Sequence, residues 1–263
     1  MKFTEVGSSG VIYMTVEDFP ARNVFTTRYG GVSTDQFSTL NLGVREGEDM
    51  AHLAENYAIL AKATGIDTSR MGYTHQVHRT DVKILTSEDA LAPGVFPEYK
   101  ADAVVTAEKG LPLVCFTADC IPVLLCAPGK AVAAVHCGWR SSTADILKNV
   151  LDAMETLGAR AKDIYAAIGP GICWEHFQVS QDVIDAAESW LGDLTGLVKR
   201  DTRGENKYLF DLKNANRRRL EQLGMKPKRI VVTEDCTMCT PDKYWSHRVT
   251  HGRRGLQAGI IVL

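Results

Sequence analysis

Apolar positions along the chain form two patterns, short continuous runs and stripes at helical spacing. The runs predict strands, and they cover residues 101–106, 111–117, 164–168, 208–212, 229–233 and 256–263. A strand–turn–strand is predicted between Ala118 and Arg140. Shorter strands broken by Pro20 are expected over residues 11–28, and the alternation over residues 73–85 is typical of a strand.

Helical stripes predict four helices, at residues 50–64, 142–157, 183–191 and 213–223. The first carries Leu53, Tyr57 and Leu60 on one side and stops at Gly65. Strands and helices are interspersed without strict alternation, so the fold class is α/β or α+β with mixed sheets. No repeat of fixed period and no linker-like stretch divides the chain, which predicts a single domain over residues 1–263.

Composition narrows the class of protein. The chain has 263 residues, of which 45% are hydrophobic and 24% charged, as in ordinary soluble domains. A net charge of −2 argues against a nucleic-acid partner, and residues 217–219 (three arginines) are expected on a solvated helix face. No apolar run has membrane-spanning length and the N-terminus lacks a signal-peptide core, so a cytoplasmic location without membrane contact is the default expectation. The seven cysteines predict reduced thiols.

Three residues are candidate ligands of one metal ion. Cys120 and His136 stand at the ends of the predicted strand–turn–strand, and His78 lies in the alternating segment. Thiolate sulfur and imidazole nitrogen suit zinc, and three protein ligands leave a fourth position open for catalysis. The separations of 42 residues (120 − 78) and 16 residues (136 − 120) carry no local signature. Cys120 as a buried small hydrophobe and His136 as a core histidine remain alternatives.

A second set of candidate ligands consists of two pairs of residues, each closely spaced in the sequence. Cys236 and Cys239 form a C-x2-C pair, and Cys173 and His176 form a C-x2-H pair. The two pairs together would suit a structural zinc site. The alternative is that the distant pairs never meet and serve separate purposes.

Neighbouring residues add two further candidates. Asp119 next to Cys120 is a candidate proton carrier or ligand contact, with a turn-forming aspartate as the alternative. Arg140 directly precedes a predicted helix, where an anion such as phosphate is favoured, with a solvated arginine as the alternative.

Several segments together resemble the YfiH-like family, also called the multicopper polyphenol oxidase or laccase-domain family. They are residues 26–33, 40–43, 74–78, 117–125, 134–140, 167–172, 235–239 and 252–263. The resemblance implies two packed mixed sheets flanked by helices. It also implies zinc bound by His78, Cys120 and His136, the three residues selected by their chemistry.

The activity implied by the resemblance is phosphorolysis of adenosine, inosine and 5′-methylthioadenosine, with adenosine deamination beside it. The expected partners are therefore a small nucleoside and phosphate, and the protein is expected to be a monomer or homodimer. Asn41 and Gln76 are candidates to orient the nucleoside. Many family members carry an arginine where this chain has Tyr57, and Arg28, Arg45 or Arg140 could replace it as a phosphate contact.

Three alternatives remain open at this point. A copper-dependent polyphenol oxidase also suits mixed imidazole and thiolate ligands, although oxygen reduction to water normally needs several copper ions. A metal-free enzyme could use Cys120 as nucleophile and His136 as base. The third alternative is a non-catalytic protein or a hydrolase that uses Cys120 and His136 to edit peptidoglycan precursors, an activity to which the family has also been linked.

Overall fold

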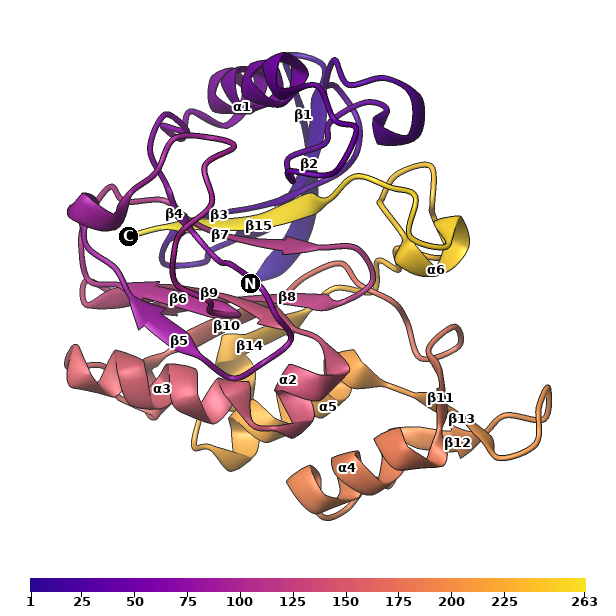
Figure 1. Ribbon diagram of the computed structural model, residues 1–263. Helices are drawn as coiled ribbons and strands as arrows, with labels where there is room; N and C mark the ends of the chain where they lie inside the picture. Colours follow the sequence, from indigo (N-terminus) through magenta and orange to yellow (C-terminus); the bar gives the residue numbers. More distant parts are fainter.

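The computed structural model describes residues 1–263, and most of its strands form two six-stranded sheets that lie face to face (Figure 1). The first sheet has the order β1 (Lys2–Ser8), β2 (Val11–Glu17), β3 (Arg22–Thr26), β15 (Gln257–Val262), β7 (Leu113–Thr117) and β4 (Gly72–Tyr73). The second has the order β14 (Ile230–Val232), β10 (Tyr165–Ile168), β8 (Ile121–Ala127), β9 (Ala131–Cys137), β6 (Ala103–Thr106) and β5 (Val82–Ile84). Parallel and antiparallel pairs occur in both sheets, which confirms the predicted mixed fold class.

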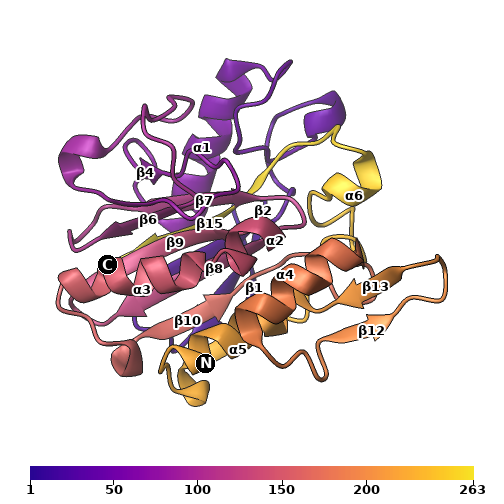
Figure 2. The same ribbon diagram turned by 60° about the horizontal axis from the view of Figure 1, so that its bottom comes forward.

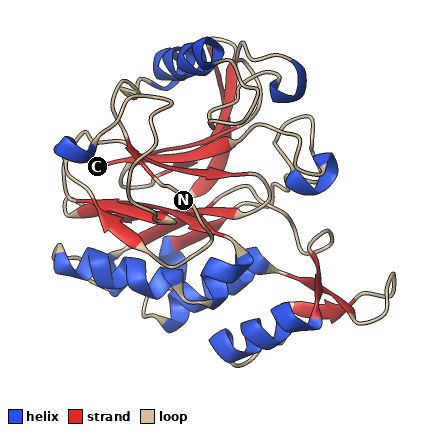
Figure 3. Ribbon diagram, viewed as in Figure 1, coloured by secondary structure: helices blue, strands red, loops and turns tan.

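Helices cover the outer face of each sheet, so the molecule has helical layers outside two sheet layers (Figure 3). Helix α1 (Met50–Thr64) packs on the first sheet through Leu53, Tyr57 and Leu60. The second sheet is covered by α2 (Trp139–Thr143), α3 (Ile146–Thr156) and α5 (Leu212–Gln222), and α4 (Gln181–Leu191) packs on α2 and α5 (Figure 2). Strands β8 and β9 are therefore buried on both faces, which explains their continuous apolar sequence.

Two smaller elements flank the layers. A three-stranded sheet consists of β11 (Gln178–Ser180), β13 (Lys207–Phe210) and β12 (Val198–Arg200), and it lies beside α4 (Figure 1). Helix α6 (His247–Thr250) precedes β15. None of the helices combines the length and the apolar character needed to cross a membrane.

Helix α1 illustrates a local prediction that is confirmed. It spans the predicted residues 50–64, and Gly65 ends it in a left-handed conformation with φ of 67°. Asp49 caps its start by accepting a hydrogen bond from the Ala51 N–H. Here the apolar stripe, the cap and the stop all lie within the same stretch of sequence, so no distant contact was needed to define the helix.

The strand predicted over residues 73–85 is wrong in its middle. Only Gly72–Tyr73 and Val82–Ile84 are strands, and His78 between them has a φ of +59°. The N–H groups of Val77, His78 and Arg79 instead donate to the carboxylate of Asp102. A turn wrapped around a buried carboxylate therefore replaces the extended conformation that the alternation favoured.

The helix predicted over residues 142–157 is in fact two helices, α2 and α3. Asp145 between them has a left-handed φ of 71°. Its carboxylate accepts hydrogen bonds from Arg219 at 2.9 and 2.5 Å and from Trp190 at 3.1 Å. The break therefore serves a tertiary contact, and Arg219 belongs to that contact rather than to a wholly solvated face.

Candidate metal centre

The β8–β9 hairpin brings Cys120 and His136 to the same end of the second sheet. The antiparallel register pairs Ile121 with Cys137 and Pro122 with His136. Cys120 directly precedes β8, and His136 is near the end of β9, so the two side chains meet at the open end of the hairpin. Cys120 and His136 are 16 residues (136 − 120) apart in the sequence, but their side chains lie next to each other in the structure.

Asp102 joins His78 to this pair. It directly precedes β6, which pairs with β9 and, in parallel, with β5. Its fully buried carboxylate accepts the three N–H bonds of the His78 turn at 2.9, 3.0 and 3.0 Å. It also lies 2.7 Å from Nδ1 of His136. One carboxylate therefore orients the imidazole of His136 and holds the backbone that carries His78.

The three side chains form a group that fits a metal ion. The candidate ligand atoms of His78, Cys120 and His136 all lie within 4.8 Å of one another. Gly138 keeps the space between them clear, since a Cβ at that position would lie 3.0 Å from His78 and 3.4 Å from the Cys120 sulfur. Because Asp102 occupies Nδ1 of His136, Nε2 is the nitrogen left for a metal, as is usual for histidine ligands with a carboxylate partner.

The charges in this group favour the thiolate. Burial opposes ionisation of Cys120, but His136 and His78 outweigh it and lower the pKa of the thiol to about 6. Burial likewise lowers the pKa of His136, whereas the Cys120 thiolate and Asp102 raise it to about 9. Zinc binds cysteine as the thiolate, and its binding would release the extra proton of His136. The same thiolate beside a protonated imidazole also suits a cysteine nucleophile.

A pocket opens directly onto His78 and Cys120. Its other lining residues come from five parts of the chain and are Ala118, Asp119, Trp139, Ile172, Phe177, Leu212, His247, Arg248 and Arg254. Asp119 lies at the pocket, but both of its carboxylate oxygens are engaged. They accept hydrogen bonds from the Thr237 hydroxyl at 2.6 Å and from the Arg248 N–H at 2.7 Å. Asp119 thus ties the Cys120 turn to the C-terminal segment rather than bonding its own backbone.

The four residues predicted to bind substrate are not among those that line this pocket. Asn41 is fully buried and its amide bonds to Gly43, Glu48 and the Leu256 N–H. The Gln76 side-chain amide donates a hydrogen bond to the Phe116 carbonyl and accepts one from the Phe116 N–H. The Arg28 guanidinium donates to two backbone carbonyls and lies 3.9 Å over the Trp245 ring. Arg140 is exposed and lies over Trp139.

Sequence reasoning missed Asp102 and the C-terminal part of the pocket. Arg254 contributes a buried Nε that has no hydrogen-bond partner, while its Nη2 lies 3.4 Å from Nδ1 of His247. Burial and the charge of Arg45 lower the pKa of Arg254 to about 10, against the opposing effect of Asp119 and Cys120. The only local signal was the arginine pair 253–254 in a polar stretch before the last strand, which does not indicate where that stretch folds.

The second set of candidate ligands is also brought together. Cys173, His176, Cys236 and Cys239 present four ligand atoms within 4.8 Å of one another. The sequence alone left open whether the two pairs meet, and the structure answers that they do.

Comparisons with known proteins agree with this architecture. A family model described as multi-copper polyphenol oxidoreductase laccase matches residues 22–263. A purine nucleoside phosphorylase of Deinococcus radiodurans is 34% identical over 97% of this chain and 94% of its own length. The crystal structure of YlmD from Geobacillus stearothermophilus superposes with a TM-score of 0.87 at 30% identity, covering 99% of this chain and 98% of YlmD. The structure of Bacillus licheniformis YfiH has a TM-score of 0.90 at 27% identity, with coverage of 99% and 98%.

Proposed function

The chain belongs to the multi-copper polyphenol oxidoreductase laccase family, and within that family we propose that it is a zinc-dependent purine nucleoside phosphorylase. Relatives from Deinococcus radiodurans and Geobacillus stearothermophilus carry the name purine nucleoside phosphorylase. The observation that carries the proposal is the buried, unpaired Nε of Arg254 in the same pocket as Cys120 and His78. Nη1 of Arg254 donates to the Gly255 carbonyl and Nη2 lies 3.4 Å from Nδ1 of His247, so Nε is the nitrogen without an acceptor. A guanidinium with an unused N–H group beside a candidate metal site suits a reaction with phosphate.

His78, Cys120 and His136 would hold the zinc ion. When bound there, zinc would supply a Lewis acid that polarises a ribose hydroxyl, a phosphate oxygen or a water molecule. Asp102 keeps Nδ1 of His136 occupied, and the exposed side of His78 leaves the site open toward the pocket. An open position is typical of catalytic rather than structural zinc.

Arg254 would bind the phosphate that attacks the anomeric carbon of the ribose. Its Nε needs an acceptor, because a buried donor without one is costly. Arg248 and His247 line the same side of the pocket, and the charge of Arg45 acts on both Arg254 and His247. This excess of positive charge would lower the cost of bringing a phosphate dianion next to the substrate.

The remaining wall of the pocket would accommodate the purine. Trp139 and Phe177 supply aromatic rings, and Ile172 and Leu212 supply aliphatic surface. Flat apolar surfaces suit a purine ring, while the polar lining residues His247, Arg248 and Arg254 suit the ribose and phosphate. Adenosine, inosine and 5′-methylthioadenosine all present a purine on a ribose, so we propose them as substrates.

Adenosine deamination is the second activity that we propose, and we rank it below phosphorolysis. It needs a group that transfers protons beside the water that attacks the purine. Asp119 is the candidate, but Thr237 and Arg248 already use both of its oxygens. Proton transfer through Asp119 would therefore first require one of these hydrogen bonds to break.

The metal-free cysteine enzyme is the main rival. A thiolate at Cys120 beside a cationic His136 would serve a nucleophile equally well. However, a nucleophile and its base leave no task for His78, which completes the group of three ligands. Inactivation by iodoacetamide that added zinc does not prevent would favour the rival.

The test of function is an assay of purine release with the purified chain. We expect hypoxanthine from inosine and adenine from adenosine only when phosphate is present, with ribose 1-phosphate as the other product. Inosine formed from adenosine without phosphate would measure deamination separately. Release of base at the same rate without phosphate would contradict phosphorolysis, and oxidation of phenols by a copper-loaded chain would favour the oxidase.

Replacing Arg254 with methionine should weaken phosphate binding while leaving nucleoside binding largely unchanged. Losing charge-assisted hydrogen bonds worth about 1.5–3 kcal/mol corresponds to a roughly 10- to 100-fold rise in KM for phosphate. The matched control is Arg253→Met, because Arg253 is the exposed neighbour and lies outside the pocket. An unchanged phosphate KM in the Arg254 variant would remove Arg254 from the phosphate site.

A further inference from the structure

A second cluster of metal-binding side chains lies outside the pocket. The Sγ atoms of Cys173 and Cys239 lie 3.3 and 3.4 Å from Nδ1 of His176, and Sγ of Cys236 lies 3.8 Å from the same nitrogen. The sulfurs of Cys173 and Cys239 are 3.9 Å apart. None of the four residues lines the pocket that contains His78 and Cys120.

These separations match those around a tetrahedral zinc ion. Zn–S bonds of about 2.3 Å and Zn–N bonds of about 2.0–2.1 Å place two sulfurs roughly 3.8 Å apart and sulfur and nitrogen roughly 3.6 Å apart. The observed distances of 3.9 Å and of 3.3–3.8 Å lie around these values. Three cysteines and one histidine form a closed ligand set with no open position, which is typical of structural zinc.

The backbone holds the two pairs in register. Within each pair a turn brings its members together, with Phe177 N–H donating to the Cys173 carbonyl and Thr240 N–H to the Cys236 carbonyl. Between the pairs, a bridge joins Gly171 to Cys236, and the Cys173 N–H points at the Cys236 sulfur from 3.2 Å. An N–H group directed at a sulfur stabilises the thiolate that a metal requires.

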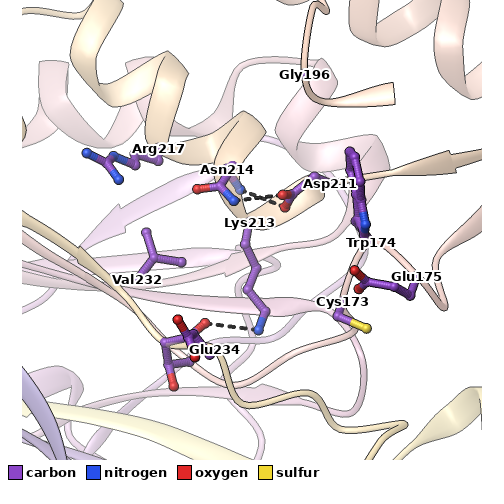
Figure 4. A pocket seen from close by; sticks show the side chains of 11 residues that line it. Cys173, Trp174, Glu175, Gly196, Asp211, Lys213, Asn214, Arg217, Val232 and Glu234 are labelled. Atoms are coloured by element: carbon purple, nitrogen blue, oxygen red, sulfur yellow. Dashed lines mark hydrogen bonds between the residues drawn. The ribbon is translucent and has the colours of Figure 1, made fainter. Parts of the chain in front are cut away.

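A buried lysine supplies the charge balance. Three thiolates and an imidazole around a divalent ion leave one net negative charge. Lys213 is 5% exposed, and its ammonium donates to the Asp235 carbonyl at 2.6 Å, one residue from Cys236. Figure 4 shows Lys213 extending toward the segment of Glu234, with Cys173 at the edge of the same cavity. Burial lowers the pKa of Lys213, and Cys236 and Cys173 offset this lowering only in part.

We propose that Cys173, His176, Cys236 and Cys239 bind a structural zinc ion in a second site separate from the candidate catalytic centre. The site joins the segment after β10 to the segment after β14. The first segment contributes Phe177 to the pocket, and Thr237 of the second donates a hydrogen bond to the pocket residue Asp119. Zinc there stabilises the pocket wall, whichever reaction the pocket performs.

The test is the zinc content of purified variants after passage over a chelating resin. We expect about two zinc ions per chain in the unaltered protein, about one in Cys239→Ser and about one in His78→Ala. The double variant should hold none. Cys239 is exposed, so its replacement perturbs packing least, and Cys126→Ala, which removes a core thiol outside both groups, should keep both ions.

Cobalt provides a second measurement that does not depend on activity. His78→Ala lacks the pocket site, so Co²⁺ added to the metal-free variant should give the absorption bands of tetrahedral thiolate-bound cobalt. These bands should be lost when Cys239→Ser is added. The proposal is overturned if folded His78→Ala binds neither zinc nor cobalt, or if Cys239→Ser keeps as much zinc as the unaltered protein. It is also overturned if mass spectrometry finds a disulfide between any two of Cys173, Cys236 and Cys239. A single zinc lost only in Cys239→Ser would support this site and count against zinc in the pocket.

Discussion

Replacing His78 with alanine should abolish zinc binding in the pocket and reduce phosphorolysis to background, while the fold remains intact. Loss of residues that merely orient a ligand costs about 10- to 100-fold in metal affinity, so loss of a ligand itself should cost more. The fold should tolerate the change because His78 is exposed and its backbone, not its imidazole, bonds to Asp102. Zinc analysis, the inosine assay and thermal unfolding of the same preparation would measure all three effects.

The matched control for this experiment is His52→Ala on helix α1. His52 lies outside the pocket and outside both groups of candidate ligands. The His52→Ala variant should have the same zinc content and the same rate of inosine phosphorolysis as the unaltered protein. If His78→Ala lost its zinc but retained full activity, the metal would have no part in the reaction, and the Cys120–His136 nucleophile would become the better hypothesis.

Replacing Asp102 with asparagine should have the second largest effect, and it should change stability and metal binding together. The carboxylate accepts three backbone N–H bonds and lies 2.7 Å from His136. An asparagine would direct an NH₂ group at some of these donors, and breaking such a buried charged network costs about 3–5 kcal/mol of unfolding free energy. Zinc affinity should fall about 10- to 100-fold, because His136 would lose its fixed orientation.

Urea unfolding of the metal-free proteins would measure the stability difference, and competition with a chelator would measure zinc affinity.

The pH dependence of the unfolding free energy gives an independent check on the role of Asp102. Burial raises the pKa of Asp102, but the hydrogen bonds from His136 and from the N–H groups of Arg79 and Val77 outweigh burial and lower it. A lowered folded-state pKa means that the stabilisation is present above the unfolded-state value of about 3.9 and is lost as pH falls through the folded value. An Asp102→Asn variant as stable as the parent at neutral pH would contradict this account.

Local sequence was sufficient where an element is defined by its own neighbours. Residues 50–64 contain the stripe, the cap and the stop of α1, and the predicted bounds agree with the structure. The β8–β9 hairpin was likewise visible from two apolar runs around Pro128 and Gly129. Local sequence failed at residues 73–85 and 142–157, where Asp102 and Arg219 supply hydrogen bonds from distant parts of the chain.

The candidate site divides in the same way. Residue chemistry selected His78, Cys120 and His136 as candidate ligands, but their convergence depends on the pairing of β6, β8 and β9. Asp102 gave no signal that distinguishes it from other charged residues, and the segment 252–263 resembled the family without indicating that Arg254 lines the pocket. The importance of both residues comes from burial and from partners far away in sequence.

By itself the sequence determined the types of most of the longer elements, the apolar strands that must be buried on both faces, and the thiols and imidazoles available for metal binding. These properties depend on residue type and on spacing within a few turns of chain. Only the tertiary structure decided which of these groups meet. The two cysteine-containing pairs at 173–176 and 236–239 come together because Gly171 and Cys236 lie side by side. Arg254 becomes a pocket residue because the C-terminal segment folds back over Asp119. Such encounters result from sheet pairing between distant segments, and no local pattern encodes them.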